Sequence, residues 1–169
     1  MTIAEHTRDE ALRILDGFQT IVESEAIAHG WYITDDVQNP ELKAKGALCN
    51  GQRMCAIGSL WVASGEYRRL PNGTIRLTGT QSQRDYIATR PALKLVYEVL
   101  DEVSREYVED HRIFLPKAGW EGWLEVLFES GFTKLGLRDL NDPPAVTQGE
   151  REILLSLIQS AREEIQDEY

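Results

Sequence analysis

Apolar residues recur at helical spacing near the start of the chain. Thr2 and Glu5 stand in the Thr-x-x-Glu pattern of a capping box, in which the two residues bond each other's backbone N–H groups. The apolar positions that follow lie three or four residues apart, with charged residues between them: Leu12, Leu15, Phe18, Val22 and Ala26. This pattern predicts a long amphipathic helix that reaches about His29, where Gly30 can adopt the left-handed conformation that ends helices.

Helical spacing returns in the second half of the chain. Pro91 suits the first position of a helix, and apolar residues follow at intervals of three and four: Leu93, Val96, Leu100, Val103 and Tyr107. Residues 111–116 break this pattern. An aromatic-rich helix follows over residues 120–128, and we expect it to end at Ser130 and Gly131.

A last helix is predicted after a second capping-box pattern, formed by Thr147 and Glu150. Its apolar residues lie on one face: Leu154, Leu157, Ile158, Ala161 and Ile165. Each long helix of the chain is therefore apolar on one face only, and that face needs a surface to pack against.

The stretch Leu48–Trp61 has a different character. It holds both cysteines of the protein, Cys49 and Cys55, and its small and bulky apolar residues surround a predicted helix over residues 52–64 on nearly every face. A short helix that is apolar all round belongs in the middle of a core. We therefore predict that residues 52–64 form a buried central helix, which begins at Asn50 or Gly51.

The remaining segments predict little regular structure. Residues 31–50 carry turn-forming residues and read as a loop, and residues 82–89 read as a short helix. A Pro-Asn-Gly turn at residues 71–73 lies between two short stretches with strand-forming residues, which predicts a small β-hairpin near 67–78. The fold class that follows is mainly all-α: one domain over residues 1–169, with five or six helices packed as a compact bundle around residues 52–64.

The charge balance changes the expected partners. The chain has 18 basic and 28 acidic residues and a net charge of −10, which argues against general nucleic-acid binding, because binding phosphates needs a positive surface. Six basic residues nevertheless gather in the middle of the chain, where we interpret them as a solvated surface: Arg68, Arg69, Arg76, Arg84, Arg90 and Lys94. The first residues lack a secretory pattern and no run of 18 apolar residues occurs, so we expect a cytoplasmic protein with free thiols.

Three short motifs follow one another along the chain: Gly30-Trp31, Cys55-Ala56-Ile57-Gly58-Ser59-Leu60, and Leu140-Asn141-Asp142-Pro143-Pro144 followed by Thr147 and Glu150. In their order and intervals they resemble a family of small actinobacterial and mycobacteriophage proteins that is catalogued only as a domain of unknown function. The residues of the predicted hairpin and the mid-chain arginines are additions to that pattern. The resemblance implies a compact helical fold in a bacterial or phage-infected cell, and it supplies no catalytic residue.

One catalytic hypothesis can be built from the residues. The order Cys55, His111, then Asn141 or Asp142 is the order of nucleophile, base and orienting group in papain-like thiol hydrolases, and a helix N-terminus favours a thiolate. The competing interpretation is structural. A cysteine in a buried helix packs as a small apolar residue and is inert, and Asn141 and Asp142 fix the start of the last helix through local hydrogen bonds.

No cofactor or metal site is expected. His and Cys residues do not occur at ligand spacings such as Cys-x-x-Cys, and the chain has no phosphate-binding glycine loop. We therefore expect a protein that acts by binding a host or partner protein, with nucleic acid and membranes unlikely to be its partners. The alternatives are the thiol hydrolase and an acidic mimic of nucleic acid.

Overall fold

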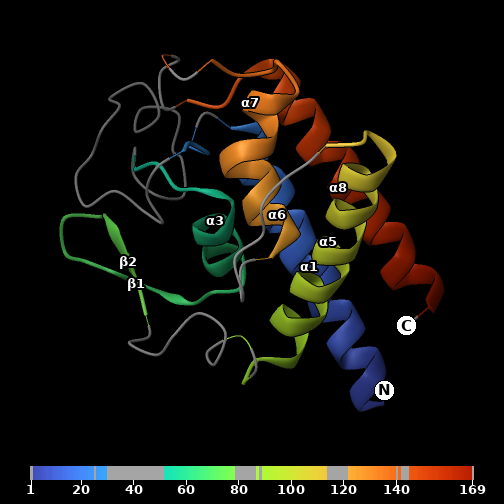
Figure 1. Cartoon of the computed structure of the whole chain (residues 1–169). Helices are drawn as coiled ribbons and strands as arrows, with labels where there is room; N and C mark the ends of the chain where they lie inside the picture. The colour runs from blue at the N-terminus through green and yellow to red at the C-terminus, as the bar shows by residue number, and fades with distance from the viewer. Residues whose placement is uncertain are drawn as a thin grey trace.

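The computed structural model describes residues 2–24, 26–29, 52–78, 87, 89–113, 122–139, 141 and 145–168. Three long helices form the main body: α1 (Ile3–Glu23), α5 (Pro91–Asp110) and α8 (Gln148–Glu168). All three pack against one another, and both chain ends lie at the same end of this group (Figure 1). The mainly helical bundle predicted from the sequence is confirmed.

The predicted helix starts explain where two of these helices begin. Thr2 and Glu5 make the capping box, with hydrogen bonds of 3.1 and 2.8 Å between each side chain and the other's backbone N–H. Pro91 occupies the first turn of α5, where its missing N–H removes no helical hydrogen bond. The predicted helical faces are buried in the core, and the largest fully buried side chains include Leu15, Phe18, Leu93 and Leu100. Each such side chain contributes roughly 1.5–3 kcal/mol.

The helix α3 (Ala56–Ala63) packs beside this body, against α1. Residues 56–62 are all buried, which agrees with the prediction of a helix that is apolar on every face. The predicted start was wrong, because Cys55 caps the helix in place of Asn50 or Gly51, and residues 52–55 are not helical. Gly17 of α1 lies so close to Ala63 that a Cβ on Gly17 would stand 3.1 Å from the Ala63 Cβ, so the two helices meet at small residues.

The first helix is shorter than predicted. It ends at Glu23 with Ser24 as its C-cap, and the Ser24 hydroxyl donates to the Ile21 carbonyl. Residues 26–29 then run in a bent, extended path in which the Ala28 N–H donates to the Met54 carbonyl and the Met54 N–H donates to the Ala26 carbonyl, each at 2.8 Å. Ala26 is buried as its spacing suggested, but it lies in a turn, and the next residue, Ile27, pairs with Met54 in the chain before α3.

The aromatic-rich helix also differs from its prediction. It begins as α6 (Trp123–Val126), continues through the π-helical turn η1 (Leu127–Gly131) and ends as α7 (Phe132–Lys134). Gly131 has helical angles (φ −66°, ψ −39°) and does not end the helix; Gly136, with φ +73°, follows its last turn. The wider π turn accommodates one extra residue, and such turns occur frequently at functional sites. The predicted start at Trp120 lies outside the described residues, as does most of the predicted helix at 82–89 and the loop at 31–50.

The predicted hairpin is confirmed. Strands β1 (Tyr67–Arg69) and β2 (Ile75–Leu77) pair antiparallel, and the hairpin lies beyond α3, away from α5 and α8 (Figure 1). No helix among the described residues is both long enough and apolar enough to span a membrane.

Candidate functional site

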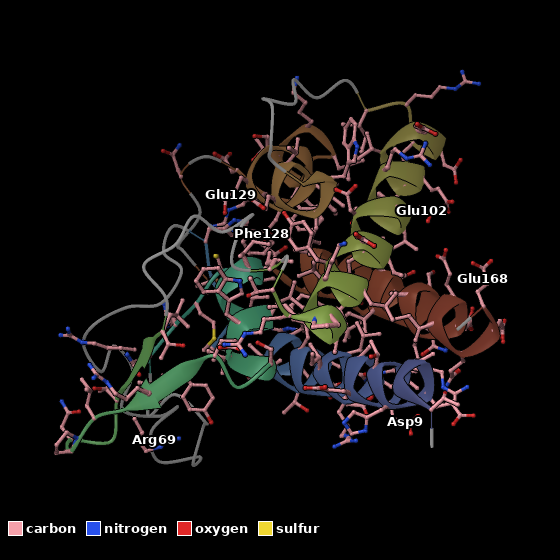
Figure 2. All side chains as sticks on the ribbon, turned by 90° about the horizontal axis from the view of Figure 1, so that it is seen from below. Asp9, Arg69, Glu102, Phe128, Glu129 and Glu168 are labelled. Carbon is pink, nitrogen blue, oxygen red and sulfur yellow. The ribbon has the colours of Figure 1, made fainter. Side chains whose placement is uncertain are left out.

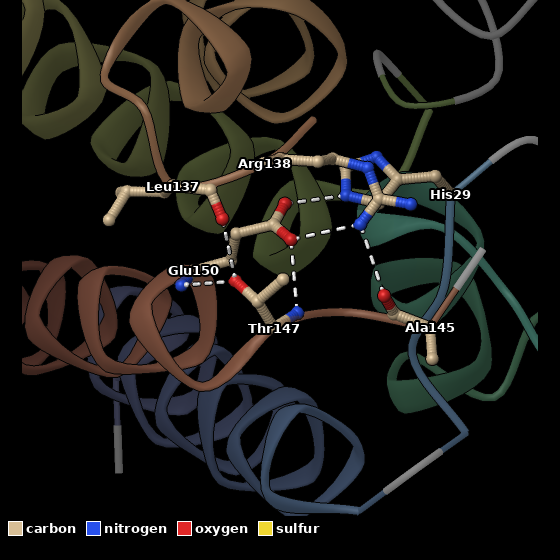
Figure 3. A network of polar contacts seen from close by, with 6 residues as sticks. All are labelled: His29, Leu137, Arg138, Ala145, Thr147 and Glu150. Atoms are coloured by element: carbon tan, nitrogen blue, oxygen red, sulfur yellow. Dashed lines mark hydrogen bonds and ion pairs between the residues drawn. The ribbon is translucent and has the colours of Figure 1, made fainter. Parts of the chain in front are cut away.

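Glu150 lies at the centre of a polar network that joins three distant segments of the chain (Figure 3). It belongs to the first turn of α8, and its side chain is fully buried. Its Oε1 accepts the backbone N–H of Thr147 at 3.0 Å, while the Thr147 hydroxyl accepts the backbone N–H of Glu150 at 3.2 Å. This reciprocal pair is the second capping box predicted from the sequence.

Two further side chains bind the same carboxylate. Arg138 donates from Nη1 to Oε1 at 3.0 Å and to the Ala145 carbonyl at 3.0 Å. The Nε2 atom of His29 lies 2.6 Å from Oε2, and the imidazole ring stacks on Phe128 with a centroid distance of 4.0 Å. The side chains of His29 and Arg138 are only 11% and 10% exposed, so water hardly screens these contacts.

The electrostatics of the network follow from these contacts. Burial by itself would raise the pKa of Glu150, but the hydrogen bonds from His29, the Thr147 N–H and Arg138 more than offset burial, and the pKa of Glu150 is lowered. Glu150 is therefore ionised at neutral pH and held by charge-assisted hydrogen bonds. Glu129 on η1 lies nearby; partial burial raises its pKa, and the proximity of His29 and Arg138 offsets part of that effect.

The described contacts of the network do not form a catalytic arrangement. Both oxygens of Glu150 already accept hydrogen bonds, and among the described residues no Ser, Thr or Cys side chain is hydrogen-bonded to His29. A general base needs such a nucleophile or a substrate within hydrogen-bond reach. The contacts instead join the start of α8, the segment that carries Arg138 and the chain after α1, so we interpret the network as a structural connection between them.

The proposed nucleophile Cys55 is a free, buried thiol at the N-cap of α3. The pKa of Cys55 is raised to about 11, mainly by burial; hydrogen bonds from the backbone N–H groups of Gly58 and Ile57 lower it, and the nearby charges of Glu129 and Glu125 raise it. The helix terminus is therefore present as expected, but the thiol is protonated at neutral pH. These properties are those of a packed cysteine.

The other proposed catalytic residues lie elsewhere. His111 is exposed at the C-cap of α5, where its Nδ1 bonds the Tyr107 carbonyl at 2.9 Å and its ring stacks on the Tyr107 ring. Asn141 is exposed, and its backbone N–H donates to Asp139 Oδ1 at 3.0 Å. Asp142 lies outside the described residues. No hydrogen bond joins Cys55, His111 and Asn141, so the thiol hydrolase stays a hypothesis without a geometric basis in the part of the chain that is described.

The hairpin carries a second concentration of charge, this one on the surface. In its register Arg68 stands directly opposite Arg76, so both side chains lie on the same face, and both are exposed. Neither makes an ion pair or hydrogen bond through its side chain within the described residues. We call these two residues the arginine pair. Like charges directly opposite each other destabilise a sheet, so the pair costs the hairpin up to about 1 kcal/mol.

The arms of the hairpin are held firmly despite this repulsion. Directly after the turn, at the first residue of β2, the fully buried Gln52 side chain accepts the Ile75 N–H at 2.7 Å and donates to the Ile75 carbonyl at 3.0 Å, as a neighbouring strand would. At its tip Gly73 has φ +88°, and Asn72 Oδ1 accepts both the backbone N–H and the hydroxyl of Thr74. Arg69 braces the turn by donating to the Gly73 carbonyl at 2.7 Å.

Comparison of the chain with protein-family models, with curated proteins and with solved structures found no match. Within the described residues, no three His, Cys, Asp or Glu side chains are grouped so that they could hold a metal ion. The sequence pattern indicated Glu150 as a helix cap and the mid-chain arginines as a cluster. It gave no signal for the convergence of His29 and Arg138 on Glu150.

Proposed function

We propose that this protein acts by binding another protein, and that the hairpin over residues 67–77 makes the contact. The observation that carries the proposal is the arginine pair: two exposed guanidinium groups on one face of the hairpin, for which no described residue supplies a counter-ion, in a chain of net charge −10. An acidic protein could neutralise these charges with its own carboxylates. Arg138 and Arg162, by contrast, do pair with acids of this chain.

The anchoring of the hairpin supports a binding role. A protruding element that is already ordered loses little conformational entropy when it docks, so more of the contact energy appears as affinity. The hydrogen bonds between Gln52 and Ile75 tie the start of β2 to the core, and Asn72 fixes the turn. Figure 2 shows the hairpin, marked by Arg69, extending away from the helices.

The experiment compares three forms of the tagged protein in quantitative affinity purification from cells of its source organism. We expect a reproducible partner for the wild type, and its loss for Arg68→Gln/Arg76→Gln. The control Arg13→Gln/Lys134→Gln makes the same change in net charge at two exposed positions away from the hairpin, and should retain the partner. The proposal fails if no form recovers a reproducible partner, or if the hairpin variant recovers it as well as the wild type does.

A further inference from the structure

We infer that the surface recognised by the hairpin is a short acidic protein segment that presents two carboxylates, one to Arg68 and one to Arg76. This inference rests on the proposed binding function and adds the chemistry of the partner. Arginine forms two parallel hydrogen bonds with one carboxylate through its planar guanidinium group, so two arginines can take two carboxylates without competition.

The spacing of the arginine pair fits such a segment. Residues directly opposite in an antiparallel pair have Cβ atoms about 4.5–5.5 Å apart, as Arg68 and Arg76 do by their register. Acidic residues four positions apart on a helix have Cβ atoms about 5–6 Å apart. One acidic helical turn can therefore reach both guanidinium groups at once.

The small extent of the positive charge around the arginine pair favours a short acidic segment as the partner. Arg69, the neighbouring residue of β1, alternates to the opposite face of the strand and donates to the Gly73 carbonyl. Arg90, at the start of α5, lies 3.1 Å from the Glu66 carboxylate, which offsets its charge. Among the described residues, the face that carries the arginine pair thus offers two positive charges without a counter-ion, and two carboxylates neutralise them completely.

The rest of the molecule disfavours a nucleic acid in the same place. A DNA duplex carries about one negative charge per 1.7 Å of its axis and is bound through many phosphate contacts, whereas the chain has ten more acidic than basic residues. Among these acids, Glu164 on α8 has a pKa that is raised first by burial and then by the nearby carboxylates of Glu102 and Glu168, so negative charge is crowded there. Figure 2 places Glu102 and Glu168 far from the hairpin, so a compact acidic segment can dock without meeting them.

The test uses two helical 15-residue peptides and NMR. One peptide carries a pair of glutamates four positions apart, and its twin carries glutamines at the same positions. Each is titrated to millimolar concentration into the full-length protein at about 50 mM salt, and the side-chain Nε–H signals of Arg68 and Arg76 are followed. A single-stranded oligothymidylate of eight nucleotides is titrated in parallel.

We expect the glutamate peptide to shift both arginine signals and its glutamine twin to leave them unchanged. Arg68→Gln/Arg76→Gln, followed through the hairpin backbone signals, should bind the glutamate peptide about 5- to 30-fold more weakly, as expected for two exposed ion pairs. Arg68→Lys/Arg76→Lys should lose part of the affinity, because lysine keeps the charge but not the paired hydrogen bonds. Arg13→Gln/Lys134→Gln should bind within about 2-fold of the wild type, since these exposed residues belong to α1 and α7 and salt screens the charges of exposed side chains.

Three results would overturn the inference: no shift of the arginine signals by the glutamate peptide, equal shifts by both peptides, or tighter binding of the oligothymidylate. The proposed function is judged separately, by the affinity purification. If the purification recovers a partner that depends on the arginine pair, but the protein does not bind the glutamate peptide, the inference of an acidic segment is refuted and the proposed binding function is supported.

Discussion

Replacing Glu150 by glutamine tests the buried network most sharply. Glu150→Gln keeps the size of the side chain and removes its charge, so Arg138 loses the carboxylate of its buried ion pair with Glu150. Breaking a buried ion pair by removing one partner costs about 3–5 kcal/mol. We expect the lower end, about 3 kcal/mol, because Arg138 keeps its bond to the Ala145 carbonyl and glutamine can still accept the Thr147 N–H.

The assay is chemical denaturation at pH 7, supported by thermal unfolding. For a chain of this length, a loss of about 3 kcal/mol corresponds to a melting temperature lower by roughly 6–12 °C. Glu152→Gln is the matched control, because Glu152 lies two residues further along the same helix and is exposed, so its change should stay within about 0.5 kcal/mol. If Glu150→Gln also stays within 0.5 kcal/mol of the wild type, the network does not hold the segments together and the reasoning is refuted.

The pH dependence of the same pair of proteins checks the electrostatics. The pKa of Glu150 is lowered below its ordinary value of 4.5, so its contribution to stability is fully present above that value. The contribution is lost as the pH falls through the lowered pKa of the folded state. The stability difference between wild type and Glu150→Gln should therefore shrink on going from pH 6 to pH 3, and a constant difference would contradict the assignment.

Two further changes test the thiol and the hairpin. In a Cys49→Ser background Cys55 is the remaining thiol, and its pKa is raised to about 11, mainly by burial. We therefore expect iodoacetamide to leave the native protein unmodified at pH 7.5 and to label it fully after denaturation. Labelling of the native protein at the rate of a small free thiol would contradict this. Arg76→Glu places opposite charges across from each other, so we expect the free energy of unfolding to rise by roughly 0.5 kcal/mol at low salt and by less at 1 M salt. A fall in the free energy of unfolding would show that a negative group neutralises Arg76 in the native protein.

Local patterns in the sequence predicted the parts of the fold that local physics determines. Pro91 and the two capping boxes marked the starts of helices, and the Pro-Asn-Gly turn marked the hairpin, because each acts within a few residues. The early end of α1 could not be predicted in this way. Ala26 continues the apolar spacing of the helix, and only its pairing with Met54, 28 positions later, shows that the segment is extended.

The same limit applies to the candidate sites. Glu150 was predicted as a cap through Thr147, three residues away, but His29 lies 121 positions from it and Arg138 lies 12. No periodicity connects residues at such distances. Arg68 and Arg76 were noted as members of a basic cluster, and only the register of the two strands shows that they face each other. At Cys55 the sequence supported two opposed interpretations, a thiolate at a helix start and an inert thiol in an apolar helix, and the thiol is buried as the apolar pattern of that helix indicated.

The binding role of the hairpin is tested most directly by comparing how much partner protein is recovered with Arg76→Glu, with the wild type and with Arg13→Glu. Both variants add the same negative charge at an exposed position, but only one disrupts the arginine pair. We predict that Arg76→Glu folds at least as stably as the wild type and loses the partner in quantitative affinity purification, while Arg13→Glu retains it. Equal recovery by the two variants would contradict the proposal that the arginine pair binds another protein.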